Sequence, residues 1–254
     1  MEKYSPEERH QHIIEQLRSQ NKVMASELAE RLGTTEATIR RDLRHLAEQG
    51  LCKRIHGGAM SFAPASGTQQ ERLQRNSDEK QRLAGRALTV VKAHQLIFLD
   101  ASSTNLILAG MLPTDKQLTV VTNSPLIALC LLEQNAVKVI QIGGELDPIV
   151  GGAVDNVAIQ ALSRFHFDIC FLGVCAWSSE HGFSANNFQD AEFKRVAASR
   201  SSESVVMITQ DKVDVFGRYP FLPSDQLGCL VSSDHSNALQ AVFANATCQW
   251  ITTQ

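Results

Sequence analysis

Hydrophobic residues recur with helical spacing over residues 6–60 and form short, nearly continuous runs beyond about residue 95. In the first region, apolar side chains at positions 13, 14 and 17 predict a helix that begins near Pro6. A shorter helix is predicted from about Ser26 to Leu32, and Gly33 suits the left-handed residue that ends such a helix. The change of pattern along the chain indicates two domains.

A third helix is predicted after a tight turn. Thr35 is a suitable N-cap, and the helix is expected to end at Gly50. Its buried face is expected to consist of Ile39, Leu43, Leu46 and Ala47. Residues 51–55 then have the composition of a strand, and residues 56–59 that of a turn. Three short helices followed by such a β-wing are typical of a winged helix-turn-helix domain.

The face of the third helix opposite its apolar stripe is basic. At about 100° per residue, Ala37, Arg41 and Arg44 lie opposite Ile39. Short side chains let a helix enter the major groove of DNA, and arginines reach phosphates or guanine edges. A solvated basic face is the alternative, and the position between a turn and a basic wing favours DNA binding. Asp42 is expected to pair locally. The residues predicted to contact DNA are Thr35, Thr38, Arg40, Arg41, Arg44 and His45 in the helix and Lys53, Arg54 and His56 in the wing.

The stretch between the two patterns is rich in small residues and helix breakers. Residues 61–68 indicate a linker, and a helix capped by Ser77 is expected to lead into the second domain. We therefore expect a DNA-binding domain at residues 1–60, a linker at residues 61–76, and a larger domain for effector sensing and oligomerisation at residues 77–254.

Short apolar runs in the second domain predict strands, and helical segments fall between most of them. This alternation implies an α/β domain with a mostly parallel sheet that is covered on both faces. Such sheets bind ligands at the carboxyl ends of their strands. The predicted strands are residues 96–99, 118–121, 137–142, 168–174, 204–209, 227–231 and 248–252.

Two of these strands run into loops that are rich in hydroxyl and amide side chains. Residues 100–104 read Asp-Ala-Ser-Ser-Thr, residues 122–124 read Thr-Asn-Ser, and each loop precedes a predicted helix. Hydroxyls and backbone N–H groups at a helix N-terminus suit a phosphate. Ordinary N-capping is the alternative for either loop alone. Two such loops on neighbouring strands favour a site for an anionic ligand.

Bulk composition narrows the possible partners. The formal net charge is −3 over 254 residues, so any DNA-binding surface is a local basic patch. The six cysteines lie mostly in apolar runs without the paired spacing of a zinc site, so we expect free thiols, no metal and no cofactor. No apolar run is long enough to span a bilayer, and the first residues do not resemble a signal peptide. We therefore expect a cytoplasmic protein.

Three motifs stand out in the first sixty residues. They are Leu28-x3-Leu32-Gly33-Thr34-Thr35-x2-Thr38-Ile39-Arg40-Arg41-Asp42-Leu43, Glu48-Gln49-Gly50-Leu51 and Arg54-x-His56-Gly57-Gly58-Ala59. Together they resemble the DeoR family of bacterial transcription regulators. Met24 stands where such proteins usually carry a Ser or Thr cap for the second helix, and Ser26 is the alternative cap.

The resemblance continues through the second domain. It is carried by Ser77-x-Glu79-Lys80, Leu99-Asp100-x2-Ser103-Thr104, Val121-Thr122-Asn123-Ser124, Gly143-Gly144-Glu145-Leu146, Phe167-Asp168-x2-Phe171-Leu172-Gly173, Asp211-Lys212 and Phe216-Gly217-Arg218. It implies a sensor domain in the fold group of ribose-5-phosphate isomerase and glucosamine-6-phosphate deaminase, which commonly senses phosphorylated sugars or related metabolites. By this resemblance, the effector is surrounded by Asp100, Ser102, Ser103, Thr104, Thr122, Asn123, Ser124, Gly143, Gly144, Asp190, Lys194 and Lys212.

The chain departs from the family pattern at three places. Ser102 replaces the usual glycine, which either narrows the room for a phosphate or adds a hydroxyl to it. Asp190 stands where a glutamate is usual, and Lys194 follows one helical turn later. Residues 213–215 separate Lys212 from Phe216, which breaks the family's Asp-x-Ser-Lys-Phe-Gly pattern. These changes indicate an effector or a pocket shape that differs from the commonest ones.

The leading hypothesis is a DNA-binding regulator, a repressor of a carbohydrate-metabolism operon, controlled by a phosphorylated sugar. Its partners would be operator DNA and further copies of itself, as a homodimer or homotetramer, and not a membrane. The rival is an isomerase- or deaminase-like enzyme with a DNA-binding appendage, although no catalytic motif supports one. A third hypothesis is an oligomerisation scaffold without a small ligand. Nominal general bases for the enzyme would be Asp100, Asp168, Asp190 and Glu192, with His166 and His181 as looser candidates.

Overall fold

The computed structural model describes residues 4–253 except 65–66, 135–136, 234–236 and 245. The N-terminal domain, residues 4–60, is formed by α1 (Pro6–Gln20), β1 (Lys22–Met24), α2 (Ala25–Leu32), α3 (Glu36–Glu48), β2 (Lys53–Ile55) and β3 (Gly58–Met60). The strands form an antiparallel sheet in the order β1-β3-β2. Helix α2, the turn and helix α3 form the predicted helix-turn-helix, and β2 and β3 form the predicted wing.

Local signals in the sequence explain most of these boundaries. The Ser5 side chain accepts a hydrogen bond from the N–H of Glu8 and so caps α1. Thr35 caps α3 by accepting from the N–H of Thr38 at 3.2 Å. Ser26 does not cap α2: Met24 holds the N-cap position and makes no side-chain cap bond, because its backbone belongs to strand β1, which was not predicted.

The chain between the domains is more ordered than the sequence suggested. Within the predicted linker, residues 69–74 form helix α4 (Gln69–Gln74), which begins with a capping box from Thr68 to Glu71. Helix α5 (Ser77–Ala87) follows, with Asn76 at its N-cap position in a left-handed conformation. The prediction that Ser77 caps this helix was therefore wrong by one residue, because Ser77 is already helical. A short 3-10 turn, η1 (Leu88–Val90), leads into the sheet.

All seven predicted strands are present, and they form one parallel sheet in the order β15-β14-β12-β9-β4-β5-β6. The predicted fold class is therefore confirmed. Their bounds lie within a few residues of the predicted ones. The strands are β4 (Leu96–Leu99), β5 (Thr119–Thr122), β6 (Lys138–Gln141), β9 (Phe167–Leu172), β12 (Ser201–Ile208), β14 (Cys229–Ser232) and β15 (Gln249–Thr252).

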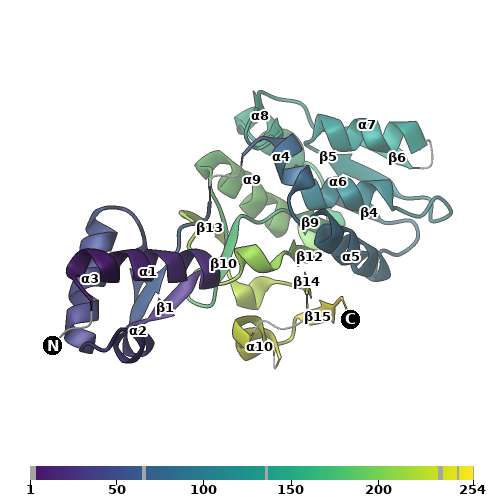
Figure 1. The fold of residues 1–254 in the computed structure, drawn as a ribbon. Helices are drawn as coiled ribbons and strands as arrows, with labels where there is room; N and C mark the ends of the chain where they lie inside the picture. The colour runs from purple at the N-terminus through teal and green to yellow at the C-terminus, as the bar shows by residue number, and fades with distance from the viewer. Residues whose placement is uncertain (1–3, 65–66, 135–136, 234–236, 245, 254) are drawn as a thin grey trace.

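Helices cover both faces of this sheet (Figure 1). One hydrophobic core lies under α5, α6 (Ser103–Gly110) and α7 (Pro125–Gln134). A second core lies on the opposite face, under α8 (Asn156–Leu162), α9 (Phe188–Ser199) and α10 (Asn237–Phe243). Because both faces are buried, the strands are apolar along most of their length, which is why they could be recognised in the sequence.

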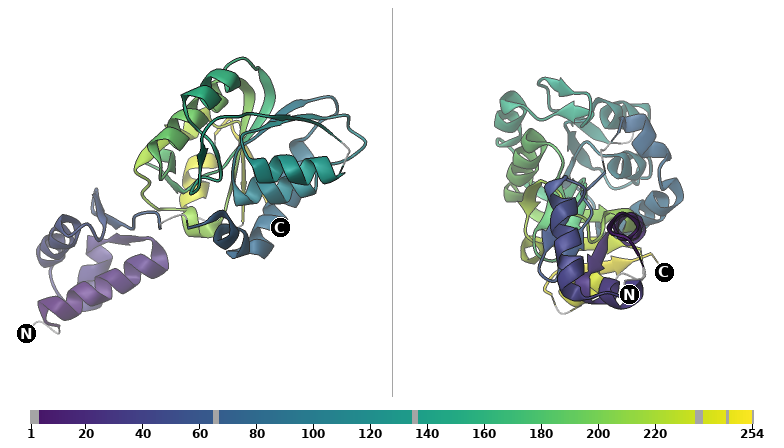
Figure 2. Two further views of the ribbon diagram at one scale, coloured as in Figure 1. Left: turned by 90° about the horizontal axis from the view of Figure 1, so that it is seen from above. Right: turned by 60° about the vertical axis from the view of Figure 1, so that its left-hand side comes forward.

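Two small sheets extend the C-terminal domain beyond this framework. Strands β10 (Ala176–Ser178), β11 (Gly182–Ala185) and β13 (Tyr219–Leu222) form an antiparallel sheet. Strands β7 (Leu146–Asp147) and β8 (Gly152–Ala153) form a hairpin. Short 3-10 turns are η2 (Gln210–Lys212) and η3 (Ser224–Gln226). Figure 2 shows the N-terminal domain, in purple, projecting from one side of the C-terminal domain.

The described part of the chain contains no helix with the length and apolar character needed to cross a bilayer. The six cysteines, all within the described residues, form no disulfide, and four of them are buried, as the apolar runs around them predicted.

Candidate DNA-binding surface and effector cavity

Helix α3 is held to the N-terminal domain by an apolar face and by one buried ion pair. Ile39, Leu43 and Leu46 are almost completely buried in the domain core. Between them, Asp42 is 5% exposed and accepts hydrogen bonds from Arg9 at 2.8 and 3.3 Å. The expectation that Asp42 pairs locally was therefore wrong. Its partner lies on α1, because Asp42 falls on the buried side of the helix, where α1 packs.

The opposite face of α3 is open to solvent. Arg40, Arg41, Arg44 and His45 are exposed, and so is Thr35 at the start of the helix. Arg41 and Arg44 make no ion pair with the described residues, whereas Arg40 pairs with Glu36 at 2.7 Å across one helical turn. The ring of His45 stacks on His10 with centroids 5.2 Å apart, which fixes that side chain against α1. The free arginines are thus at the middle of the exposed face.

The wing places its basic residues in two directions. Arg54 and His56 are exposed, and Gly57 forms the hairpin turn with a φ of 78°, which favours glycine. Lys53 is also exposed, but its ammonium lies 5.0 Å from the ring centre of Phe216 in the C-terminal domain. Lys53 is therefore already engaged with another part of the chain.

A cavity of about 760 Å³ opens at the carboxyl ends of β4, β9 and β12. Its wall is built by the loops that follow these strands, by the N-terminus of α6, by α4 and α9, and by residues of the linker. Two carboxylates, Asp190 and Asp211, face an excess of positive charge. The cationic side chains that line the cavity are Arg72, Arg75, Lys80, Lys194, Lys212 and Arg218.

Helix α6 points its N-terminus at this cavity. Ser103 and Thr104 are its first residues, so their N–H groups have no carbonyl partner within the helix. Ser102, the replacement for the family's glycine, has a φ of −144° and so adopts an ordinary extended conformation. Its hydroxyl accepts from the N–H of Asn105 at 3.1 Å. Ser102 therefore caps the helix, and its substitution for glycine requires no strained backbone.

Gly173 is required by close packing at the same edge. A Cβ at this position would lie 2.6 Å from the Cβ of Ser102 and 3.0 Å from a carboxylate oxygen of Asp100. The N–H of Gly173 donates to that oxygen at 2.9 Å. Only a residue without a side chain lets β9 end this close to the loop that follows β4.

A buried ion-pair triad forms one side of the cavity. Lys194 contacts both Asp190, one turn earlier on α9, and Asp100, at 3.3 Å. Burial opposes the charge on Lys194, but Asp100 and Asp190 outweigh it and raise the pKa of the lysine. Burial and the negative charge of Asp100 raise the pKa of Asp190, although Lys194 acts in the opposite direction. Lys194 is therefore cationic, but its charge is already shared by two carboxylates.

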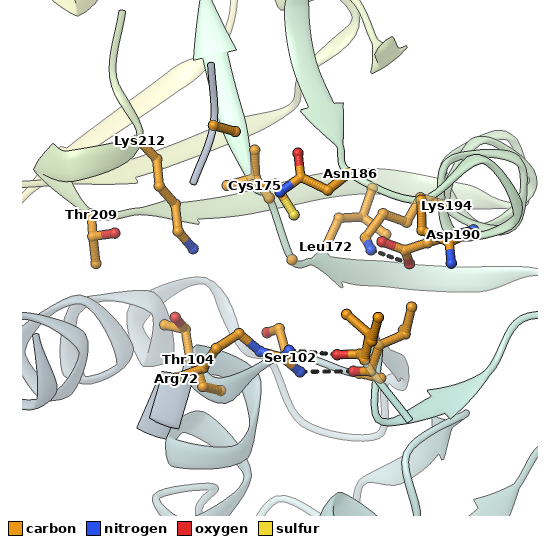
Figure 3. A pocket seen from close by; sticks show the side chains of 18 of the residues that line it. Arg72, Ser102, Thr104, Leu172, Cys175, Asn186, Asp190, Lys194, Thr209 and Lys212 are labelled. Carbon is orange, nitrogen blue, oxygen red and sulfur yellow. Dashed lines mark hydrogen bonds and ion pairs between the residues drawn. The ribbon is translucent and has the colours of Figure 1, made fainter. Parts of the chain in front are cut away.

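Lys212 is a cation of the cavity wall that forms no ion pair with the described residues. It is half-buried, and its ammonium has no hydrogen-bond or ion-pair partner among the described residues. Burial lowers its pKa; Cys175 and Asp211 act in the opposite direction, and the positive charges of Arg72 and Lys194 add to the effect of burial. Figure 3 shows Lys212 pointing into the cavity from the side opposite to Arg72. The hydroxyl of Thr209, next to it, is buried without a hydrogen-bond partner in the described part of the chain.

Two further cations of the cavity wall, Arg72 and Lys80, mainly hold the wall together. Arg72 donates to the carbonyls of Gly67 and Val150 at 2.9 Å each, and also to that of Ile149. Lys80 donates to the carbonyls of Arg72 and Arg75, and burial lowers its pKa to about 8. Helix α4 is thereby fixed against the sheet edge. The sequence did not single out Arg72, because it lies in a stretch that resembled a linker.

Six residues predicted around the effector do not line the cavity: Thr122, Asn123, Ser124, Gly143, Gly144 and Asp100. The first three are completely buried, and their polar groups are used within the protein. Asn123, for example, accepts from the N–H of Ala101 at 2.9 Å and donates to the carbonyl of Ala153 at 3.0 Å. The loop after β5 thus supports the loop after β4. Asp100 also lies behind the cavity wall, where it contacts Lys194.

The nominal general bases are dispersed or neutralised. Asp168 accepts from the N–H of Leu96, and Glu192 pairs with Arg195 on the outside of α9. His166 contacts Arg200, and His181 contacts Ser178, both outside the cavity. The described residues form no cluster of His, Cys, Asp and Glu that would hold a metal ion. Of these nominal general bases, only Asp190 lines the cavity, and it is paired with Lys194.

Comparison with known proteins agrees with this organisation. Residues 75–234 match the model of the DeoR C terminal sensor domain, and residues 9–64 match the DeoR-like helix-turn-helix domain. The chain is 32% identical over 244 residues to the HTH-type transcriptional regulator GolR of Listeria innocua, covering 95% of this chain and 96% of that protein. It is 30% identical over 212 residues to the glycerol-3-phosphate regulon repressor of Escherichia coli, covering 83% of each.

Among solved structures, ribose 5-phosphate isomerase A of Methanocaldococcus jannaschii aligns with 54% of this chain and 55% of that one. The two are 15% identical, and the TM-score is 0.41.

Proposed function

Because this chain belongs to the DeoR family of transcription regulators, we propose that it represses an operon for carbohydrate use and releases its operator when a phosphorylated metabolite enters the cavity. The chain is a DNA-binding regulator and not an enzyme. In this proposal, residues 1–60 bind the operator, residues 61–76 connect the domains, and residues 77–254 sense the effector and oligomerise. The operator lies in the cytoplasm, so the protein would act there.

The observation that carries the effector proposal is the position of Lys212. Its ammonium, which has no hydrogen-bond or ion-pair partner among the described residues, lies at one wall of the cavity, and a helix N-terminus lies at the other. A phosphate accepts hydrogen bonds from N–H groups at a helix start and gains from the positive end of the helix dipole. Ser103, Thr104 and the buried hydroxyl of Thr209 would supply the remaining hydrogen bonds. We therefore propose a phosphate subsite between the start of α6 and Lys212.

The rest of the cavity suits a small polyol. A volume of about 760 Å³ is larger than a phosphate alone requires. Asn186, Asn187 and Asp190 also line the cavity, and their side chains can hydrogen-bond hydroxyl groups. Glycerol 3-phosphate is one candidate to test, since the regulon of one relative is named for it. Hexose and pentose phosphates are the others.

For the operator contacts, we propose Arg41 and Arg44 as the principal base or phosphate ligands, supported by Thr35, Thr38 and Arg40 from α3. Arg54 and His56 of the wing would contact the flanking backbone, and Lys53 and His45 would contribute less because both have partners within the protein. A two-fold symmetric operator would require a homodimer or homotetramer, which brings two copies of α3 into successive major grooves.

Two measurements test the proposal. Fluorescence anisotropy with a duplex from the region upstream of the gene should show tighter binding than with a scrambled duplex, and the difference should persist at constant ionic strength. A thermal-shift screen of sugar phosphates should identify a compound that raises the melting temperature, since a ligand of the folded state stabilises it. Equal binding to both duplexes, or no stabilising phosphate, would contradict the respective half of the proposal.

A further inference from the structure

Residues 211–219 run from the effector cavity to the N-terminal domain and back. Asp211 and Lys212 line the cavity at one end of this segment, and Arg218 and Tyr219 line it at the other. The residues between them, which we call the strap (Val213–Phe216), leave the cavity wall. The strap includes the three residues that interrupt the family motif between Lys212 and Phe216.

The first half of the strap is bound to the end of helix α1. The side-chain amide of Asn21 donates to the carbonyl of Val213 at 3.1 Å and to that of Asp211 at 3.4 Å. Asn21 is the C-cap of α1, with a φ of 63°. Next to it, the ammonium of Lys22 lies 3.8 Å from the carboxylate of Asp214. Asn21 thus binds one residue of the cavity wall, Asp211, and the residue that directly follows the wall residue Lys212 in the chain, Val213.

The second half of the strap pairs with the linker that leaves the wing. The N–H of Phe216 donates to the carbonyl of Ser61, and the N–H of Ala63 donates to the carbonyl of Phe216, both at 2.9 Å. The rings of Phe62 and Phe216 meet edge to face with their centroids 5.7 Å apart. Ala63 also lines the cavity, so the linker residue that pairs with the strap is itself part of the cavity wall.

Cations of both domains complete this junction. Lys53 of the wing lies over the ring of Phe216, and Arg218 lies 5.3 Å from the ring centre of Phe62. Arg218 belongs to the cavity lining, so one side chain contacts both the linker and the space proposed for the effector. A ligand that draws Lys212 or Arg218 toward its phosphate would act directly on residues bonded to α1 and to the wing.

We propose that the strap couples the cavity to the DNA-binding domain, so that a phosphorylated ligand bound by Lys212 changes the operator affinity through the contacts of Asn21 and Phe216. This inference rests on the proposed function. The inference adds the path of regulation to the proposed function. Ligand binding at η2 shifts the strap, and the strap shifts α1 and the linker relative to the sheet. Coupling of this kind is reciprocal, so operator binding would change the phosphate affinity by the same factor.

The test compares wild-type protein with Asn21→Gly, Phe216→Leu and the double variant. Glycine accepts the positive φ of Asn21, so the helix end is kept while both side-chain hydrogen bonds are lost. His94→Gly is the matched control, because His94 also has a positive φ, 64°, and lies before β4, at the sheet edge opposite to the cavity. Thermal melting of each full-length variant establishes that it is folded.

Operator affinity is measured by anisotropy with and without saturating inorganic phosphate, with potassium chloride added to keep the ionic strength constant. Phosphate affinity of the free protein is measured separately by calorimetry. We expect phosphate to weaken wild-type and His94→Gly operator binding about tenfold, within the range usual for allosteric proteins. In the double variant, phosphate should weaken operator binding less than about threefold, and the affinity of the free protein for phosphate should be unchanged.

The possible outcomes separate the two proposals. If the double variant binds phosphate and retains the full wild-type ratio, the strap does not carry the coupling, and the inference is wrong while the proposed function stands. If wild-type protein binds no phosphate, or its operator affinity does not respond, the proposed function fails and the inference fails with it. If phosphate no longer weakens operator binding by the double variant but still weakens it for His94→Gly, the result supports the inference that the strap carries the coupling.

Discussion

Replacing Asp42 by alanine tests how helix α3, the proposed DNA-reading helix, is held in place. The substitution removes the carboxylate that binds Arg9 through two hydrogen bonds and contacts the ring of His10 at 3.1 Å. Arg9 is only 4% exposed, so its guanidinium would lose its anionic partner without gaining access to water. The exposed arginines of α3 are not touched by this change.

The expected cost follows from burial. Removing one partner of a buried ion pair typically costs about 3–5 kcal/mol. A domain of roughly sixty residues is stable by about 3–9 kcal/mol, at 0.05–0.15 kcal/mol per residue. Asp42→Ala should therefore remove a large part of the stability of the N-terminal domain. The seven-stranded sheet, which has its own two cores, should remain folded.

Hydrogen exchange of the full-length protein, read by mass spectrometry, measures the loss of stability in each domain separately. Peptides of α3 in Asp42→Ala should lose protection by about two to four orders of magnitude, while peptides of β9 should be unchanged. Glu36→Ala is the matched control: it breaks the exposed pair with Arg40 on the same helix, which is worth about 0.2–0.5 kcal/mol. A loss of less than about 1 kcal/mol in Asp42→Ala would refute the reasoning from burial.

Three further predictions concern the two binding sites. Arg41→Ala and Arg44→Ala should each weaken operator binding by about 1–3 kcal/mol where the side chain reads a base, with intact thermal melting; unchanged affinity in anisotropy titrations would exclude both contacts. Lys212→Met should weaken phosphate binding in calorimetry. Because burial lowers the pKa of Lys212, the wild-type affinity should fall as the pH rises toward that lowered pKa, and the variant should lack this dependence. Gly173→Ala should destabilise the C-terminal domain by about 1–3 kcal/mol in thermal unfolding, because its Cβ would lie 2.6 Å from that of Ser102; a wild-type melting temperature would show that the loop yields.

The parallel sheet was predictable because of how it is buried. With helices on both faces, each strand is apolar at successive positions, and Ile97, Phe98 and Leu99 of β4 are all completely buried. The short strands β7, β8 and β10 carry no comparable signal, since they have only two or three residues each. Strand β1 was missed for the same reason. Its three residues form a strand because they pair with β3 of the wing, and their own composition does not indicate one.

The cavity was predictable only in part, because a sequence shows which residues follow strands but not which loops meet. Ser102, Ser103, Thr104 and Lys212 line the cavity, as the resemblance implied. Residues 122–124 are equally suitable for binding a phosphate. However, the side chains of Thr122 and Asn123 form hydrogen bonds with neighbouring strands and loops of the protein.

Other contributions to the sites come from long-range packing. Arg72 reaches the cavity wall through the carbonyls of Ile149 and Val150, more than seventy residues away. Arg9 reaches Asp42 from another helix in the same way. In both cases the two partners meet only because the chain folds, so the spacing of residues along the sequence could not identify them.

The central claim is that a phosphorylated ligand in the cavity controls operator affinity. It is tested most directly by titrating the stabilising sugar phosphate into complexes of operator duplex with wild-type protein and with Lys212→Met, while anisotropy reports the bound fraction. We predict that the operator dissociation constant of the wild-type protein rises with ligand concentration to a plateau. For Lys212→Met the same rise should require a much higher concentration. A dissociation constant that does not change with ligand, or identical curves for the two proteins, would contradict the claim.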